Sequence, residues 1–151
     1  MKPTLGIITS RGGHLYQMYK LKPWWRKYNR FWVTFPGEDT TSFLSRERVY
    51  YGYYPESRNI PNAVRHIVLA WKILRREQPT LLISCGAGIA PPFLYIGKLL
   101  GIRTIYIEPY DLISHPSLAG KLLSPIVDIM LVQHSSQQKF YPKALFKGAI
   151  L

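Results

Sequence analysis

The chain has 151 residues, of which 47% are hydrophobic and 14% aromatic; this suffices for one domain with a packed core and excludes a disordered chain. Its single cysteine, Cys85, excludes a disulfide scaffold and fits a reducing compartment. Lysine and arginine number 20 against 8 aspartate and glutamate, so the formal net charge is +12 and we expect an anionic partner.

Apolar runs alternate with helical patterns along the whole chain. We expect strands at residues 5–9, 31–35, 48–54, 80–85, 103–108, 128–133 and 145–151, and helices after His14, at 60–77 and at 91–100. Because the strands are continuous apolar runs, they predict a parallel sheet covered on both faces. We therefore predict one α/β domain with a Rossmann-like sheet over residues 1–151.

The helix at 60–77 has the clearest pattern, with Val64, Ile67, Val68, Trp71 and Leu74 on one face. We expect its His66 at the protein surface. Glycines and prolines interrupt the longest uncharged stretch, residues 78–97, so we expect no membrane-spanning segment and only peripheral membrane contact.

Two glycine-containing turns follow strands, at the edge where parallel sheets bind ligands. They are Arg11-Gly12-Gly13-His14 and Gly86-Ala87-Gly88. Glycines let an anion approach the backbone, and a helix start offers free N–H groups to it. His14, in the first helical turn, is placed to remain a neutral, base-competent imidazole. The alternative is that the turns only permit tight packing and that the histidine is a cap.

Glu108 closes the fifth predicted strand, 20 residues beyond Gly88. A dinucleotide-binding fold places its ribose-binding acid there, so an NAD-binding oxidoreductase is one alternative, although Pro91 interrupts the G-x-G-x-x-G pattern. A carboxylate beside an apolar sheet can also act as a general base, and Glu108 is our first candidate, with His14 second; the alternative is that Glu108 is a cap or pairs with an arginine. We expect no metal or other cofactor, and Cys85 is expected to be a packing residue.

The segment from residue 20 to residue 32 interleaves basic and aromatic side chains. Its candidate membrane-binding residues are Lys20, Lys22, Trp24, Trp25, Arg26 and Lys27. Tryptophan favours the bilayer interface, and basic residues are attracted to anionic lipid. The same composition fits a non-enzymatic lipid-binding or RNA-binding module, or a solvated face over ordinary core aromatics.

An ordered set of short motifs gives the chain a wider resemblance. The pieces are Ser10–Leu15, Leu21–Trp25, Trp32–Phe35, Arg58–Ile60, Gly86–Gly88, Tyr95–Leu99, Thr104–Glu108, Gly120–Leu123, Tyr141–Ala144 and Gly148. In this set the chain resembles the PssD-type subunits of bacterial exopolysaccharide and capsule glycosyltransferases. These are relatives of the membrane-anchored subunit of the eukaryotic dolichol-linked N-acetylglucosaminyltransferase.

The resemblance implies the N-terminal, acceptor-binding half of a GT-B glycosyltransferase, with the donor-binding half on a separate partner chain. It implies inverting transfer from a UDP-sugar, of the glucuronate or galactose class, to a saccharide on polyprenyl diphosphate. The setting would be the cytoplasmic face of the plasma membrane, without nucleic acid. The family's histidine and acid map onto His14 and Glu108, and its glycine turns map onto the two described above.

Overall fold

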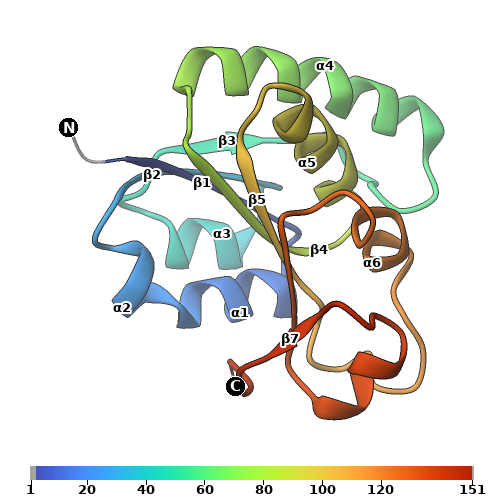
Figure 1. Ribbon diagram of the computed structural model, residues 1–151. Coiled ribbons are helices and arrows are strands. Elements are labelled where there is room, and N and C mark those ends of the chain that lie inside the picture. Colours follow the sequence, from blue (N-terminus) through green and yellow to red (C-terminus); the bar gives the residue numbers. More distant parts are fainter. Residues whose placement is uncertain (1–2, 151) are drawn as a thin grey trace.

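A computed structural model describes residues 3–150 and shows a seven-stranded parallel sheet in the order β3-β2-β1-β4-β5-β6-β7 (Figure 1). The strands are β1 (Thr4–Thr9), β2 (Asn29–Thr34), β3 (Val49–Tyr51), β4 (Leu81–Gly86), β5 (Arg103–Ile107), β6 (Ile129–Val132) and β7 (Leu145–Phe146). The helices are α1 (Gly13–Lys20), α2 (Lys22–Trp25), α3 (Glu38–Phe43), α4 (Ile60–Glu77), α5 (Ala90–Leu99), α6 (Leu118–Leu123) and the 3₁₀ helix η1 (Ser135–Lys139).

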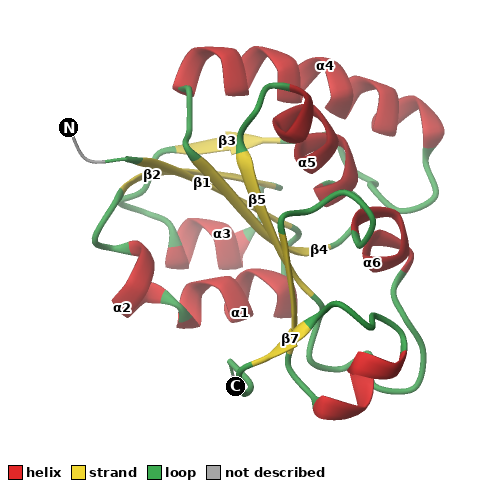
Figure 2. Ribbon diagram, in the orientation of Figure 1, coloured by secondary structure: helices red, strands yellow, loops and turns green. Residues whose placement is uncertain are grey.

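The sheet separates two layers of helices, with α1, α2 and α3 on one face and α4, α5 and α6 on the other (Figure 2). Alternation along each strand produces this arrangement, because successive side chains point to opposite faces. Ile7 and Trp32 pack beneath α1 and α2, whereas Ile8 and Val33 pack beneath α4 and α5. The predicted parallel sheet covered on both faces is confirmed.

All seven predicted strands are present, although the third and the seventh are shorter than expected; Leu151, the last residue of the seventh prediction, lies outside the described residues. The short helices α3 and α6 were not predicted, because six residues are too few for a clear periodicity. In the part of the chain that the structure describes, no helix has both the length and the hydrophobicity needed to span a membrane.

Helix α4 has the predicted bounds but an unexpected orientation. Its inward face carries Asn62, His66, Ala70, Ile73 and Leu74. Most of the predicted apolar face points outward, and Trp71 remains 43% exposed. Of the five residues that share the predicted apolar face, only Leu74 is buried.

Two polar contacts explain the orientation of α4. The His66 Nε2 atom accepts a hydrogen bond from the Tyr53 backbone N–H at 2.8 Å, and the Asn62 side chain donates to the Pro55 carbonyl at 2.8 Å. Both contacts tie the inner face of α4 to the loop that follows β3. His66 is consequently buried, contrary to the expectation of a surface position, and burial lowers its pKa.

The basic and aromatic segment after α1 also differs from its prediction. Trp25 is only 1% exposed, donates its indole N–H to the Met18 carbonyl at 2.9 Å and packs edge-on against Trp32. Trp24 is half-buried against Tyr28. Trp25 is therefore a core residue, and its assignment to membrane binding was wrong. Lys20, Lys22, Arg26 and Lys27 are exposed.

Candidate functional site

The candidate site lies where the strand order reverses, between β1 and β4. The connections from these two strands run to opposite faces of the sheet, so a crevice opens at their carboxyl ends. A hydrogen bond of 2.8 Å from the Ser10 N–H to the Gly86 carbonyl joins the two turns. The two predicted glycine turns are thus neighbours in space, as their positions after the strands indicated.

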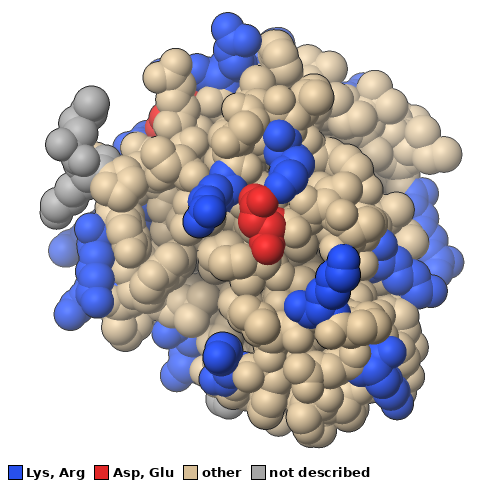
Figure 3. All heavy atoms as spheres, in the orientation of Figure 1, with Lys and Arg blue, Asp and Glu red and all other residues tan. Residues whose placement is uncertain are grey.

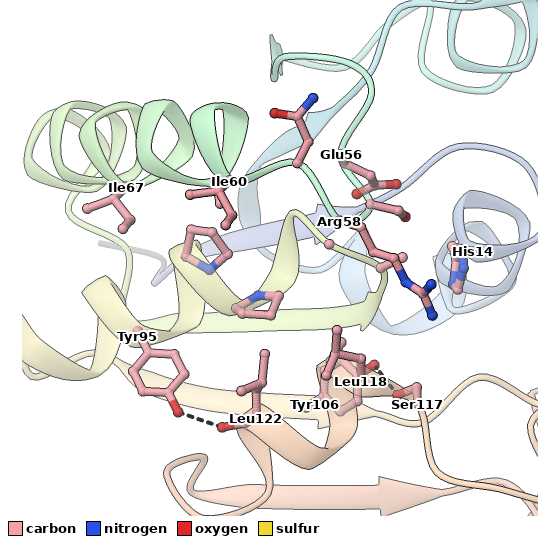
Figure 4. Close-up of a pocket in the computed structure, with 18 of the residues that line it drawn as sticks. His14, Glu56, Arg58, Ile60, Ile67, Tyr95, Tyr106, Ser117, Leu118 and Leu122 are labelled. Atoms are coloured by element: carbon pink, nitrogen blue, oxygen red, sulfur yellow. Dashed lines mark hydrogen bonds between the residues drawn. The ribbon is translucent and has the colours of Figure 1, made fainter.

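His14 is the titratable side chain best placed for chemistry. Its Nδ1 atom lies 3.1 Å from the Cys85 carbonyl oxygen. Because a carbonyl oxygen only accepts hydrogen bonds, Nδ1 carries the ring proton, and in the neutral ring Nε2 keeps its lone pair. The ring lines the main cavity of the protein, so this lone pair is available to a bound ligand (Figure 4).

The two glycines before His14 leave open space beside the helix start. A Cβ atom built at Gly12 or Gly13 would have no heavy atom within 4 Å, so packing within the chain does not demand glycine at Gly13. Gly12 has a φ of +69°, a conformation that favours glycine. Helix α1 has no side-chain cap at its start. Its first N–H groups therefore have no side-chain partner among the described residues, and such groups favour an anion.

Arg11 does not join this arrangement. Its Nε atom pairs with Asp39 at 3.2 Å, and its guanidinium packs against Gly37 rather than lining the cavity. Asp39 also accepts the Gly12 N–H at 2.7 Å. Burial raises the pKa of Asp39, but hydrogen bonds from Gly12, Thr40 and Arg11 outweigh it and lower the pKa overall. The structure thus gives Arg11 an anchoring contact and contradicts a place for it in the cavity wall.

Glu108 ends at the predicted edge of the sheet but its carboxylate points into the protein. It is 0% exposed and accepts hydrogen bonds from the Ser117 N–H at 3.1 Å, from the Ser117 hydroxyl at 2.5 Å and from the Tyr141 hydroxyl. Burial, followed by this contact with Glu108, raises the pKa of Tyr141. Glu108 therefore fastens the start of α6 to the segment before β7. The prediction that it faces the cleft as first-choice base was wrong.

The second glycine turn contributes to the cavity in part. Ala87 and Gly88 line it, whereas Gly86 lies behind His14, where a Cβ atom would come within 3.2 Å of the imidazole ring. At Gly88, a Cβ atom would lie 2.8 Å from the Glu56 carbonyl oxygen. Gly86 and Gly88 thus allow close packing, and the turn as a whole forms one side of the site.

Sequence analysis missed two charged residues of the loop between β3 and α4. Glu56 is buried and accepts hydrogen bonds from the Ser10 hydroxyl and from the Ile89 N–H, the latter at 2.8 Å, so it holds both glycine turns together. Arg58 lines the cavity, and its guanidinium points toward His14 (Figure 4). The motif piece Arg58–Ile60 was the available signal for Arg58.

The cavity has a volume of about 880 Å³ and extends well beyond His14. Helices α4 and α6 form its walls, and the first half of α5 forms its floor (Figure 4). Cys85 is buried beneath the site, and burial raises the pKa of its thiol. Among residues 3–150, no three His, Cys, Asp or Glu side chains are grouped to hold a metal ion.

Solved structures define the class of protein to which this fold belongs. The Acinetobacter baumannii MurG structure matches with a TM-score of 0.72 at 13% identity, over 89% of this chain and 43% of that one. The S. aureus MnaA–UDP structure matches with a TM-score of 0.77 at 10% identity, over 99% of this chain and 46% of that one. The chain has the fold of the N-terminal half of a GT-B protein, as predicted.

Sequence comparison then identifies the family. The profile described as "Oligosaccharide biosynthesis protein Alg14 like" matches residues 5–150, so the chain belongs to the Alg14-like family of glycosyltransferase subunits. The UDP-N-acetylglucosamine transferase subunit ALG14 of Candida albicans is 26% identical over 172 residues, 97% of this chain and 78% of the relative. The Homo sapiens subunit is 29% identical over 89 residues, 55% of this chain and 41% of the relative. The chain spans less than half of each matched GT-B structure named above.

Proposed function

We propose that this chain is the acceptor-binding subunit of a two-chain inverting glycosyltransferase. Its donor-binding partner would hold a UDP-sugar, and the acceptor would be a saccharide on polyprenyl diphosphate, in exopolysaccharide assembly. The observation that carries the proposal is the His14 imidazole, with its Nδ1 atom on the Cys85 carbonyl, beside the start of α1, which no side chain caps, at the mouth of a largely apolar cavity. Family membership favours this function over an oxidoreductase or an RNA-binding module.

In this proposal His14 is the general base. Its Nε2 atom takes the proton of the acceptor hydroxyl while that oxygen forms a bond to the anomeric carbon of the donor sugar. The bond from the anomeric carbon to UDP breaks on the opposite side, which inverts the configuration. The first N–H groups of α1 bind the acceptor diphosphate. The Cys85 carbonyl keeps the imidazole in the tautomer that this step requires.

Membrane association is proposed to use the outer face of α4, which we define as Val64, Val68 and Trp71, with Ile60 and Ile67 at its edge. These residues are exposed, and Arg65, Lys72, Arg75 and Arg76 surround them. Lysine and arginine are spread over the face shown in Figure 3, where acidic side chains occupy a small area. Apolar contact surrounded by basic side chains fits an anionic cytoplasmic leaflet better than the segment that buries Trp25.

A transfer assay with the assembled pair tests the proposal. The chain, the partner and both together are incubated with a polyprenyl-diphosphate saccharide and, in turn, UDP-glucuronate, UDP-galactose and UDP-N-acetylglucosamine. We expect transfer from one donor by the pair and none by either chain alone. Robust turnover by this chain alone would contradict the proposal that two chains are required. No transfer from any of the three UDP-sugars would contradict the proposed glycosyltransferase activity.

A further inference from the structure

The cavity beside His14 continues as a groove between α4 and α6. Ala63 and Ile67 line it on the α4 side, Pro92 and Tyr95 form its floor, and Leu118 and Leu122 line it on the α6 side (Figure 4). Apart from His14, Tyr95, Tyr106, Ser117 and the loop residues 56–59, the lining side chains of the described residues are apolar. The Tyr95 hydroxyl already donates to the Leu122 carbonyl at 2.6 Å.

The edges of this groove are unusually exposed for apolar side chains. Ile60 is 79% exposed and Leu118 is 62% exposed, and they lie on opposite sides of the groove (Figure 4). On the α4 side the edge is continuous with the outer face of α4. Contiguous apolar surface of this kind marks a site that another molecule covers.

The opposite end of the groove is cationic. Arg58 has a φ of +52°, which is uncommon for a residue with a side chain, and such strain is retained where the position of the side chain matters. None of the ion pairs found within residues 3–150 includes Arg58. Its guanidinium, which points toward His14, therefore has its donors available for an anion beside the start of α1.

A ligand for this groove needs a charged head and a long body without polar atoms. A peptide segment fits poorly, because its backbone N–H and C=O groups would lose water without finding partners in the apolar groove. An isoprenoid chain has no such groups, and a diphosphate at its end matches Arg58 and the α1 N–H groups. Head and tail of a polyprenyl diphosphate therefore match the two ends of the groove.

We propose that the groove between α4 and α6 binds the first isoprene units of the acceptor lipid, with Arg58 on its diphosphate. The lipid chain enters sideways between Ile60 and Leu118 from the bilayer on which α4 rests. This inference depends on the proposed function for the identity of the acceptor. It adds a selection step, because an acceptor would be recognised by its lipid as well as by its saccharide.

The test compares two acceptors that share a saccharide and a diphosphate but carry a polyprenyl or a short octyl chain. In the assembled pair, Ala63→Trp fills the groove, and Ser42→Trp, on exposed α3 across the sheet, is the matched control. We expect Ala63→Trp to raise KM at least about tenfold for the polyprenyl acceptor only, because the indole occupies the space of the lipid chain. A tenfold change corresponds to about 1.4 kcal/mol of binding free energy. Ser42→Trp should change neither KM.

Arg58→Gln should raise KM for both acceptors by a similar factor, because both carry the diphosphate. An equal effect of Ala63→Trp on the two acceptors, or no effect on either, would overturn the assignment of the groove. Unchanged KM values in Arg58→Gln would overturn the assignment of the diphosphate contact.

A second measurement keeps the inference testable if Ala63→Trp does not fold or if the pair proves inactive. A geranylgeranyl diphosphate analogue with a diazirine near the end of its chain is cross-linked to the assembled pair, and the labelled peptides are mapped. Labels on α4, α5 and α6 at the groove are expected. Labels confined to the partner chain or to α1–α3 would overturn it. Transfer activity without groove labelling would overturn the groove assignment and leave the proposed function intact. Groove labelling without transfer would support the groove assignment and contradict the proposed function.

Discussion

Two regions of this protein have similar compositions, but one buries its apolar side chains and the other exposes them. The segment from residue 20 to residue 32 and helix α4 both combine large apolar side chains with lysine and arginine. In the first region Trp25 and Trp32 are buried, and Arg30 lies over the Trp25 ring while it pairs with Glu47 at 2.7 Å. In α4 the apolar stripe is outside, and Arg75 covers only part of exposed Trp71. Composition therefore does not distinguish a buried cluster from an exposed apolar face.

The largest expected effect separates the two tryptophans by stability. Trp25→Ala should lower the free energy of unfolding by about 3–5 kcal/mol, because it leaves a cavity between α1, α2 and β2. Trp71→Ala should lower it by less than about 1 kcal/mol, because the side chain is half exposed. Urea denaturation of both variants measures the difference. Equal losses would mean that the two regions are not distinct in the way described.

The second prediction concerns which residue, His14 or Glu108, acts as the general base. His14→Ala should reduce kcat of the assembled pair by about 10²-fold or more, because the general base is lost. The pH–rate profile of the variant should also lose the limb that reports deprotonation of this base. Urea denaturation should show the fold retained. Glu108→Gln should instead lower stability, because it weakens the contacts with Ser117 and Tyr141. The roles are reversed if Glu108→Gln abolishes turnover in a stable protein while His14→Ala remains active.

The third prediction compares membrane binding by the two regions at equal change of charge. Val68→Glu with Trp71→Glu lowers the net charge by two, as does Arg26→Gln with Lys27→Gln. We expect the α4 pair to weaken binding to anionic vesicles at least about tenfold, because it places charge in the apolar contact, and the other pair to weaken it only slightly. Co-sedimentation measures both. Release by the second pair alone would return the membrane surface to the segment after α1.

The smallest expected effect reports on the buried face of α4. Burial lowers the pKa of His66, so the native state keeps the ring neutral while the unfolded chain takes up a proton below about pH 6.5. The contribution of His66 to the free energy of unfolding should therefore be fully present above that pH. It should fall as the pH decreases, by at most ~1.4 kcal/mol per pH unit. Denaturation at pH 7.5 and 5.5 measures the fall. His66→Gln should flatten it, since glutamine still accepts the Tyr53 N–H; an unchanged slope would assign the pH dependence elsewhere.

The site was predicted in outline and corrected in detail. The positions of Gly12, Gly13, His14 and the second glycine turn followed from the rule that ligands bind beyond the carboxyl ends of parallel strands. The direction of a side chain at such an end does not follow from that rule. Glu108 turns inward to Ser117 and Tyr141, residues 9 and 33 positions away along the chain, and His14 alone of the two candidates lines the cavity.

The sequence by itself determined the parallel sheet and the bounds of α4, because these depend on local periodicity. Its ordered motifs determined the family resemblance, which implied the N-terminal half of a GT-B fold. Only the tertiary structure decided which face of α4 is buried, that Trp25 belongs to the core, and that Arg58 lies beside His14. Each of these depends on contacts between segments far apart in the chain, such as the Tyr53 N–H bonded to His66. An amphipathic helix can turn either its apolar face or its polar face toward the sheet. In α4, hydrogen bonds to the polar face select the second orientation.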